Sequence, residues 1–226
     1  MRLLSNELET PTTRRIRLSV DGAGFRFRGG QAATLAAGAA RPTPYSIASA
    51  PHETDRDGWL EFLVKVDGSS RFGTIVETLQ PGTSIHVQGP AGTFVLPDVS
   101  HAVPLLFIAG GTGIAPMRSM ILEAMNAGHQ GSRTLVYSAR SPREFAYVNE
   151  LRRLADEGQV ALTLTLTGEV EDWTHARGRT GAEHLAELIT TGTTAFVCGP
   201  PAMVADLPAA LVSLGVPRER IRTDGW

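Results

Sequence analysis

Small residues directly follow a short apolar run at residues 104–117, which read PLLFIAGGTGIAPM. The apolar part is typical of a strand buried on both faces of a parallel sheet, and helical spacing of apolar residues begins after the loop. The loop between them lets a ligand approach the backbone closely, and its candidate binding residues are Gly111, Thr112 and Gly113. A strand, a glycine turn and a helix gather free N–H groups at a positive helix end, which suits a dinucleotide pyrophosphate.

The same stretch also allows a plainer interpretation, a tight strand-to-helix turn without a ligand. It lacks the Lys-Ser/Thr pair of a phosphate-cradling P-loop, and Pro116 stands at the third glycine of G-x-G-x-x-G. The other motifs of the chain decide between the two interpretations.

The first half contains three short stretches that combine hydroxyl, aromatic or glycine residues. An extended segment offers an aromatic face and hydroxyl groups on alternating sides, through Thr43, Tyr45, Ser46 and Ser49. A glycine–hydroxyl loop that opens a helix forms a second candidate anion site, through Ser69, Ser70, Arg71, Gly73 and Thr74. Residues 89–94 form a rigid turn. Each stretch taken singly is more often structural than functional.

Two kinds of domain are expected. Alternating segments at residues 14–20, 60–66 and 84–88, with glycine and proline turns and a helix near 74–79, predict a small antiparallel barrel over residues 1–98. Strands then alternate with helices, which predicts a parallel-sheet, Rossmann-like domain over residues 99–226. The expected strands are 104–109, 133–137, 160–166 and 194–198, and the expected helices are 114–126, 144–156, 182–189 and 201–214. The fold class is therefore β followed by α/β.

Composition excludes several classes of function. The formal net charge is −2 with interspersed charges, so no basic field indicates nucleic acid or an anionic membrane. No apolar run approaches a bilayer span, and the N-terminus lacks the apolar core of a signal peptide, so a cytoplasmic protein is expected. With the single cysteine Cys198 and six scattered histidines, neither a disulfide framework nor a metal site is expected.

In order, these motifs resemble those of the ferredoxin–NADP reductase family, over essentially the whole chain. The stretch TPYS at residues 43–46 is similar to the family's R-x-Y-S flavin motif, and residues 68–74 resemble its flavin pyrophosphate loop. Residues 110–117 resemble its nicotinamide-dinucleotide loop, and CGPPAM at 198–203 resembles its C-G-P-x-x-M signature. The resemblance implies a six-stranded, antiparallel, flavin-binding barrel joined to a nucleotide-binding domain.

The resemblance also implies roles for particular residues. Tyr45 would pack on the isoalloxazine, Ser46 would hydrogen-bond near flavin N5, and Cys198 would lie close to the nicotinamide. Trp226 would cover the flavin until nicotinamide displaces it, with Asp224 as a carboxylate two residues before it; a terminal tryptophan that plugs an apolar groove is the alternative. The C-G-P-x-x-M signature adds Gly199, Pro200 and Met203 to the cofactor-binding set.

Two departures leave the cofactors open. Thr43 replaces the family arginine that pairs with the flavin phosphate, so Arg41 or Arg71 would substitute, and FMN competes with the family default, FAD. Arg140 and Ser141 are placed to bind the 2′-phosphate of NADPH, although Arg140 could instead be a solvated charge at a strand end. Gly168 stands where NADPH-preferring relatives place a second arginine, so NADH and NADPH remain equally open.

The function that these expectations describe is hydride transfer from NADH or NADPH to a bound flavin, which passes electrons onward. One cysteine cannot hold an iron–sulfur cluster, so the acceptor would be separate: a ferredoxin, an oxygenase component, a haem protein or a small molecule. The alternative is a non-catalytic flavin- or nucleotide-sensing or regulatory subunit on the same fold, which only the Thr43 departure favours.

Overall fold

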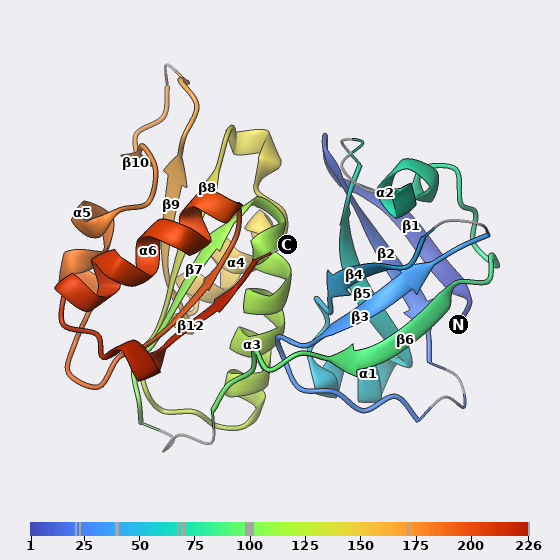
Figure 1. The fold of residues 1–226 in the computed structure, drawn as a ribbon, viewed down its shortest axis with the longest axis horizontal. Helices are drawn as coiled ribbons and strands as arrows, with labels where there is room; N and C mark the ends of the chain where they lie inside the picture. Colours follow the sequence, from blue (N-terminus) through green and yellow to red (C-terminus); the bar gives the residue numbers. More distant parts are fainter. Residues whose placement is uncertain are drawn as a thin grey trace.

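Antiparallel sheets fill the first half of the chain and a parallel sheet fills the second half (Figure 1). The computed structural model describes residues 1–20, 22, 24–38, 41–66, 68, 71–97, 102–170 and 172–225, with only the backbone of Arg71. Of the predicted site residues, Ser69, Ser70 and Trp226 lie outside the described residues, as does the expected boundary between residues 98 and 99.

Two three-stranded antiparallel sheets enclose the core of the first half. One has the order β1 (Leu3–Thr10), β2 (Thr13–Ser19) and β5 (Trp59–Lys65); the other has the order β4 (Thr43–Ser46), β3 (Ala32–Ala36) and β6 (His86–Ala91). Alternate residues of β2 and β5, such as Ile16, Leu18, Leu60 and Phe62, are fully buried between the sheets. The period-2 pattern of these strands therefore marks their inward face.

The expectation of six antiparallel strands is confirmed, but a closed six-stranded barrel is not shown. In the part of the chain that the structure describes, the ladders of the two sheets do not run on into each other: they meet at isolated bridges, between Ile47 and Phe62 on one side and between Arg2 and Ser84 on the other, with single backbone hydrogen bonds beside them. The reason is that β4 ends at Ser46 and helix α1 begins at Pro51. The chain therefore turns away before β4 can pair with β5 over more than one bridge.

Two short helices complete the first half. Helix α1 (Pro51–Asp57) was not predicted; it begins at a proline, and the Glu53 carboxylate accepts the N–H of Ala50 at 2.9 Å. Helix α2 (Arg71–Val76) replaces the helix predicted near residues 74–79 and begins three residues earlier. The edge strand β1 was also missed.

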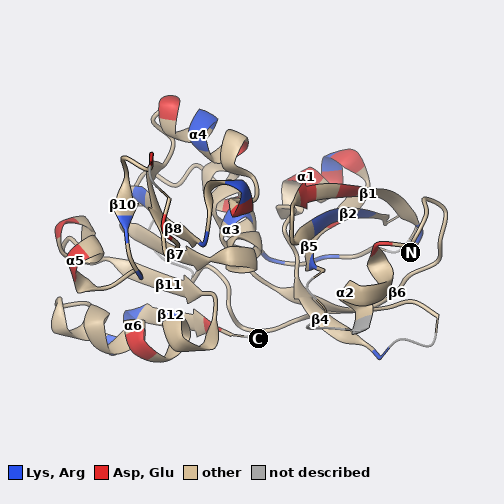
Figure 2. Cartoon of the chain, turned by 90° about the horizontal axis from the view of Figure 1, so that it is seen from above, with Lys and Arg blue, Asp and Glu red and all other residues tan. Residues whose placement is uncertain are grey.

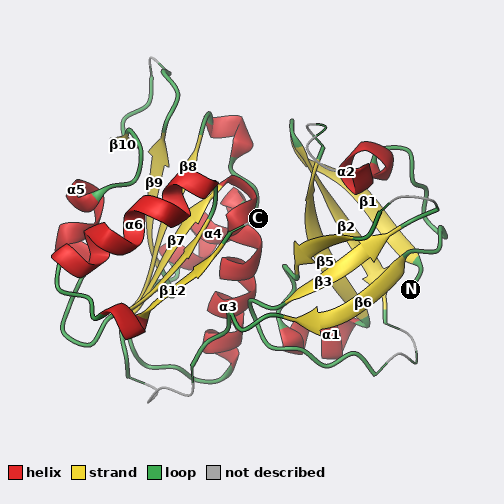
Figure 3. Ribbon diagram, viewed as in Figure 1, coloured by secondary structure: helices red, strands yellow, loops and turns green. Residues whose placement is uncertain are grey.

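Six parallel strands form the sheet of the second half, in the order β10-β9-β8-β7-β11-β12. Figure 3 shows this sheet in yellow between red helices. Four of them were predicted, and their bounds are β7 (Leu105–Gly110), β8 (Arg133–Ala139), β9 (Ala161–Leu166) and β11 (Thr194–Cys198). The short edge strands are β10 (Ala176–Arg177) and β12 (Ile221–Asp224). The chain moves from β7 in one direction to β8 and β9, and later in the other direction to β11 and β12, so the topological switch point lies at β7 and β11.

Helices cover both faces of this sheet. One face carries α3 (Ile114–Asn126) and α4 (Val148–Asp156), and the other carries α5 (Ala182–Leu185) and α6 (Pro201–Ser213). The helix predicted over residues 144–156 is interrupted: a 3₁₀ turn (Pro142–Glu144) comes first, and α4 begins only after Tyr147, whose φ of 59° is left-handed. Helix α5 is shorter than predicted and continues as a 3₁₀ turn, Ala186–Leu188.

The two halves share a core along α3. Ala48, Leu63 and Phe94 of the first half belong to the same buried cluster as the α3 side of the parallel sheet. The ring of Phe94 meets that of Phe196 edge-on at 5.9 Å. Helix α3 is therefore buried between the sheet and the first half along most of its length. In the part of the chain that the structure describes, no helix combines the length and apolar character of a membrane span.

Candidate functional site

The carboxyl ends of β7 and β11 carry two glycine-bearing loops that pack directly on each other. After β7, a 3₁₀ turn (Gly111–Gly113) leads into α3. A Cβ atom built on Gly113 would lie 2.1 Å from the carbonyl oxygen of Cys198, so only glycine fits there without moving the backbone. A Cβ atom on Gly110 would likewise lie 2.7 Å from Pro200 Cδ and 3.0 Å from Met203 Cε. The GGTG and CGPPAM motifs, separated by about 85 residues, form one surface.

Cys198 lies at the end of β11 between two neighbouring strands. In the parallel registers it is paired with Ala109 of β7 and with Asp224 of β12. The side chain is fully buried, and burial, with a smaller contribution from the Asp224 charge, raises the pKa of the thiol. Cys198 is therefore a neutral thiol at physiological pH, which excludes a thiolate nucleophile.

Asp224 adds a carboxyl group to the same edge of the sheet. It is half-buried, and burial raises its pKa above the ordinary value for an aspartate. The strand β12 thus places a carboxyl group of reduced acidity beside Cys198, at the end of the described chain.

A buried tyrosine supports the nucleotide-loop side of the site. Tyr137, near the end of β8, donates its hydroxyl proton to the Gly111 carbonyl at 3.2 Å and accepts the N–H of Ala146 at 3.1 Å. Its ring meets Phe145 edge-on at 5.0 Å. One side chain therefore fixes the loops that follow both β7 and β8, and Tyr137 was not among the predicted site residues.

On the first half, β4 presents the tyrosine and serine that were predicted as flavin-binding. The half-buried ring of Tyr45 packs at 5.6 Å from Phe72, so the strand motif touches the helix that follows the predicted pyrophosphate loop. The Ser46 hydroxyl is buried, and none of the described residues forms a hydrogen bond with it. A buried hydroxyl that the chain leaves unpaired is costly, and a ligand nitrogen would satisfy it.

The other predicted binding residues of the first half differ in burial and in the hydrogen bonds that they form. Ser49 is fully buried: its Oγ accepts the Glu61 N–H and the Thr54 hydroxyl, both at 3.1 Å, so this hydroxyl is used inside the protein rather than on a ligand surface. Thr43 Oγ1 donates to the Arg41 carbonyl at 3.2 Å. Gly73 and Thr74 lie within α2, where Gly73 is buried and Thr74 is exposed.

The loops after β8 and β9 also lie against each other. Arg140 is exposed and Ser141 is half-buried at the end of β8. A Cβ atom on Gly168 would lie 2.3 Å from the Arg140 carbonyl oxygen. Gly168 therefore lacks room for a second arginine unless the loop moves, which leaves Arg140 as the candidate for contacting a 2′-phosphate here.

A polar cleft of about 550 Å³ opens on another side of the contact between the halves. Its lining includes Glu9, Arg15, Glu61, Tyr147 and Glu150. Figure 2 shows α1 and α4 along one side of the molecule, with β4, α2 and the end of the chain along the other. The cleft is therefore separate from the surface that carries Tyr45, Ser46, Cys198 and Asp224.

Charged residues that were not predicted as functional join the two halves. Arg118 is only 7% exposed although it is an arginine, and it contacts carboxylates from both halves. The signal in the sequence is an arginine that follows four apolar residues at the start of α3, and its partners are distant in sequence.

Comparison with known proteins assigns each half of the chain to a domain family. Residues 1–96 match the family model described as an oxidoreductase FAD-binding domain, and residues 107–208 match the one described as an oxidoreductase NAD-binding domain. The chain is 31% identical to ferredoxin–NADP reductase B of Sorangium cellulosum, covering 91% of this chain and 88% of that protein. It is 33% identical to the ferredoxin–NAD(P)(+) reductase component of the naphthalene 1,2-dioxygenase system of Pseudomonas putida, covering 97% of this chain but 66% of that protein.

Solved structures show the same fold. The Amycolatopsis cytochrome P450 reductase GcoB superposes with a TM-score of 0.87 at 24% identity, covering 99% of this chain and 68% of that one. A ferredoxin NADP+ reductase from Neisseria gonorrhoeae, with bound FAD and NADP, superposes with a TM-score of 0.85 at 20% identity, covering 99% of this chain and 96% of that one. The arrangement of the two halves is thus that of known reductases.

Proposed function

Because this chain belongs to the ferredoxin–NADP reductase family, we propose that it takes hydride from NADH or NADPH onto bound FAD and passes electrons to a separate acceptor. The observation that carries the proposal is the buried Ser46 hydroxyl, which the described chain leaves unpaired on the half that matches the FAD-binding model. The fit to a flavin therefore rests on an unsatisfied group of this structure as well as on the family.

The first half would hold the flavin. Tyr45 would stack on the isoalloxazine, and its contact with Phe72 keeps the ring from turning away. Ser46 would donate its hydroxyl proton to the ring, which both orients the flavin and satisfies the buried oxygen. The flavin supplies the chemistry of accepting hydride and releasing electrons.

The second half would hold the nucleotide. The N–H groups of Gly111, Thr112 and Gly113 lie at the start of α3, where the helix dipole favours the pyrophosphate. Cys198 and Asp224 would border the nicotinamide: the thiol keeps its proton, and burial raises the pKa of the Asp224 carboxyl group. These residues bind and orient the nucleotide, which is the protein's main contribution to hydride transfer.

The flavin phosphates would need a cation to replace the missing family arginine. Arg41 is exposed beside Thr43, whose hydroxyl donates to the Arg41 carbonyl. Arg71 begins α2, and its side chain lies outside the described residues. We assign the phosphate contact to one of these two arginines because a guanidinium binds phosphate in a fork geometry.

The acceptor would be a ferredoxin or an oxygenase component. Among the relatives are the reductase component of a naphthalene dioxygenase system and that of a propane 2-monooxygenase from Rhodococcus jostii, which is 27% identical over 91% of this chain. The chain spans 57% of the length of the Rhodococcus protein. A haem protein or a small molecule remains the alternative acceptor.

An absorbance spectrum of the purified protein tests the proposal. We expect a yellow protein with flavin bands that bleach when NADH or NADPH is added without oxygen, and that recover when a ferredoxin is supplied. A colourless protein that still binds nucleotide would instead support the non-catalytic sensor, which the Thr43 departure favours.

A further inference from the structure

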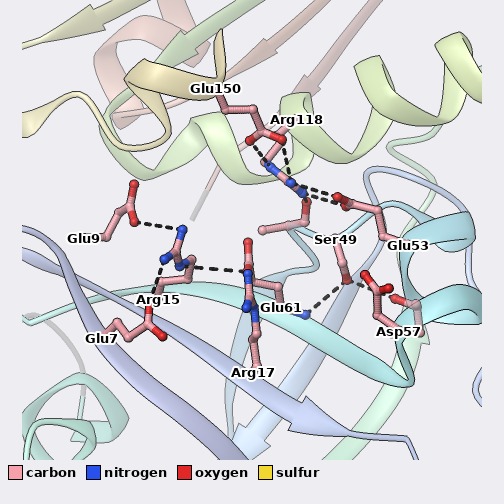
Figure 4. A network of polar contacts seen from close by, with 12 residues as sticks. Glu7, Glu9, Arg15, Arg17, Ser49, Glu53, Asp57, Glu61, Arg118 and Glu150 are labelled. Carbon is pink, nitrogen blue, oxygen red and sulfur yellow. Dashed lines mark hydrogen bonds and ion pairs between the residues drawn. The ribbon is translucent and has the colours of Figure 1, made fainter. Parts of the chain in front are cut away.

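Arg118 uses all five of its N–H donors in the seam between the two halves (Figure 4). Its Nε and Nη2 donate to the two oxygens of Glu150 at 2.6 and 2.8 Å. Its Nη1 and Nη2 donate to the two oxygens of Glu53 at 2.8 and 2.9 Å. The fifth bond runs from Nη1 to the Ala48 carbonyl at 2.9 Å. Helix α3 is thus tied to α4 on one side and to the first half on the other.

The charges make this contact strong. Burial alone would lower the pKa of Arg118, but the hydrogen bonds and charges of Glu53 and Glu150 raise it well above its ordinary value. Burial alone would raise the pKa of Glu53, but Arg118 lowers it below the ordinary value. The Arg118 guanidinium and the Glu53 carboxylate are therefore both charged at neutral pH, in a largely buried place where salt screens them little.

The contact involves the segment that follows β4, the strand that carries Tyr45 and Ser46. Next to Arg118, Ser119 Oγ donates to the Ser49 carbonyl at 2.7 Å, so two successive carbonyl groups, those of Ala48 and Ser49, are held by α3. The Glu53 oxygen that accepts from Arg118 Nη1 also accepts the Ala50 N–H at 2.9 Å. Residues 48–50 are therefore fixed to α3 by directional hydrogen bonds in addition to apolar packing.

The two candidate binding sites lie a few residues from this seam. Ser46 is two residues before Ala48, and Gly113 is five residues before Arg118. Short segments, residues 46–48 and the first turns of α3, connect the two sites to the contact, so a displacement of the contact moves one site relative to the other. Hydride transfer is sensitive to such displacement, because a misplacement of about 1 Å can cost about 100-fold in rate.

From this geometry we propose that Arg118 is a positioning residue that sets the flavin strand at Tyr45 and Ser46 against the nucleotide loop. This inference rests on the proposed function for its kinetic consequence, but its structural part does not require turnover. Arg118 itself touches neither predicted binding site.

The test compares Arg118→Lys with Glu123→Ala. Lysine keeps the charge but has three donors, so at least two of the five bonds are lost. Glu123 is the matched control: it also joins α3 to the first half, by accepting the Gly29 N–H at 3.1 Å, but near the far end of the helix. In both variants, hydrogen exchange is measured at residues 46–51 and 111–117, and anaerobic stopped flow gives the rate of flavin bleaching at saturating nucleotide.

We expect Arg118→Lys to accelerate exchange in both segments and to lower the limiting rate of bleaching about 10- to 100-fold, while flavin content and nucleotide affinity stay within about twofold. The charge-transfer absorbance between nicotinamide and flavin should weaken with it. Glu123→Ala should change none of these. Unchanged exchange at residues 46–51, or an unchanged limiting rate in a flavin-loaded variant, would overturn the proposal.

Two further results keep the inference separate from the proposed function. If the wild-type protein is not bleached by either nucleotide, the proposed function fails, and exchange at residues 46–51 alone decides the positioning role. If Arg118→Lys does not fold, Glu53→Gln takes its place, because it weakens the same link while keeping Arg118. Glu53→Gln should give a smaller change in the same direction, and wild-type exchange in Glu53→Gln would reject the proposal.

Discussion

Replacing Gly113 by alanine is expected to open the contact between the two glycine loops and to expose Cys198. The new methyl carbon would start 2.1 Å from the Cys198 carbonyl oxygen and 2.9 Å from the Gly199 nitrogen. Ordinary contact begins at 3.4 Å, so one of the two backbones must move by more than an ångström. The φ of Gly113 is −60°, which alanine adopts freely, so the whole effect is steric.

The magnitude follows from overpacking. Forcing an extra carbon into a close-packed place costs about 1–3 kcal/mol, and each 1.4 kcal/mol changes an equilibrium about tenfold. Cys198 is the single cysteine of the chain and is fully buried, so it reacts with a thiol reagent only when this edge of the sheet opens. Gly113→Ala should therefore accelerate labelling of Cys198 by about tenfold or more.

The assay is the rate of Cys198 labelling by a chromogenic disulfide under native conditions. Gly128→Ala is the control, because Gly128 has a left-handed φ of +73° and open space around it, so alanine there strains the backbone without touching the loops. The control should lower the melting temperature without accelerating labelling to the same extent. A wild-type labelling rate in Gly113→Ala would refute the close packing of the two loops.

Three other substitutions have defined outcomes. Tyr45→Ala should lower flavin affinity by about 1–3 kcal/mol through lost stacking, measured as flavin retained after dialysis, and unchanged retention would remove Tyr45 from the site. Arg140→Ala should raise the Michaelis constant for NADPH about tenfold and leave that for NADH unchanged, whereas equal losses would identify Arg140 as a solvated charge at a strand end. Asp224→Asn should raise the melting temperature at neutral pH. Burial raises the pKa of Asp224, so its ionised form destabilises the fold as pH rises through that pKa, and wild type and variant should converge below about pH 4. A constant difference across pH would contradict this reasoning.

The sequence by itself determined the elements whose signals are local. The strands β7, β8, β9 and β11 were predicted within a few residues, because short buried runs bounded by glycine or polar residues carry their own pattern. The order of four motifs determined the family, since each motif occupies consecutive residues. Strand β1 was missed because Leu4 and Leu8 remain exposed on this edge strand, so its apolar residues do not mark a single buried face.

The tertiary structure decided what depends on neighbours far apart in the chain. It showed that the Ser49 hydroxyl bonds inside the protein while that of Ser46 has no partner among the described residues, a difference that two serines on one segment do not reveal in sequence. It packed the backbone of Gly113 against that of Cys198, and it paired Arg118 with the carboxylates of Glu53 and Glu150. Burial and hydrogen bonding are properties of the assembled chain, so the fit of the two halves could be known only once both were folded together.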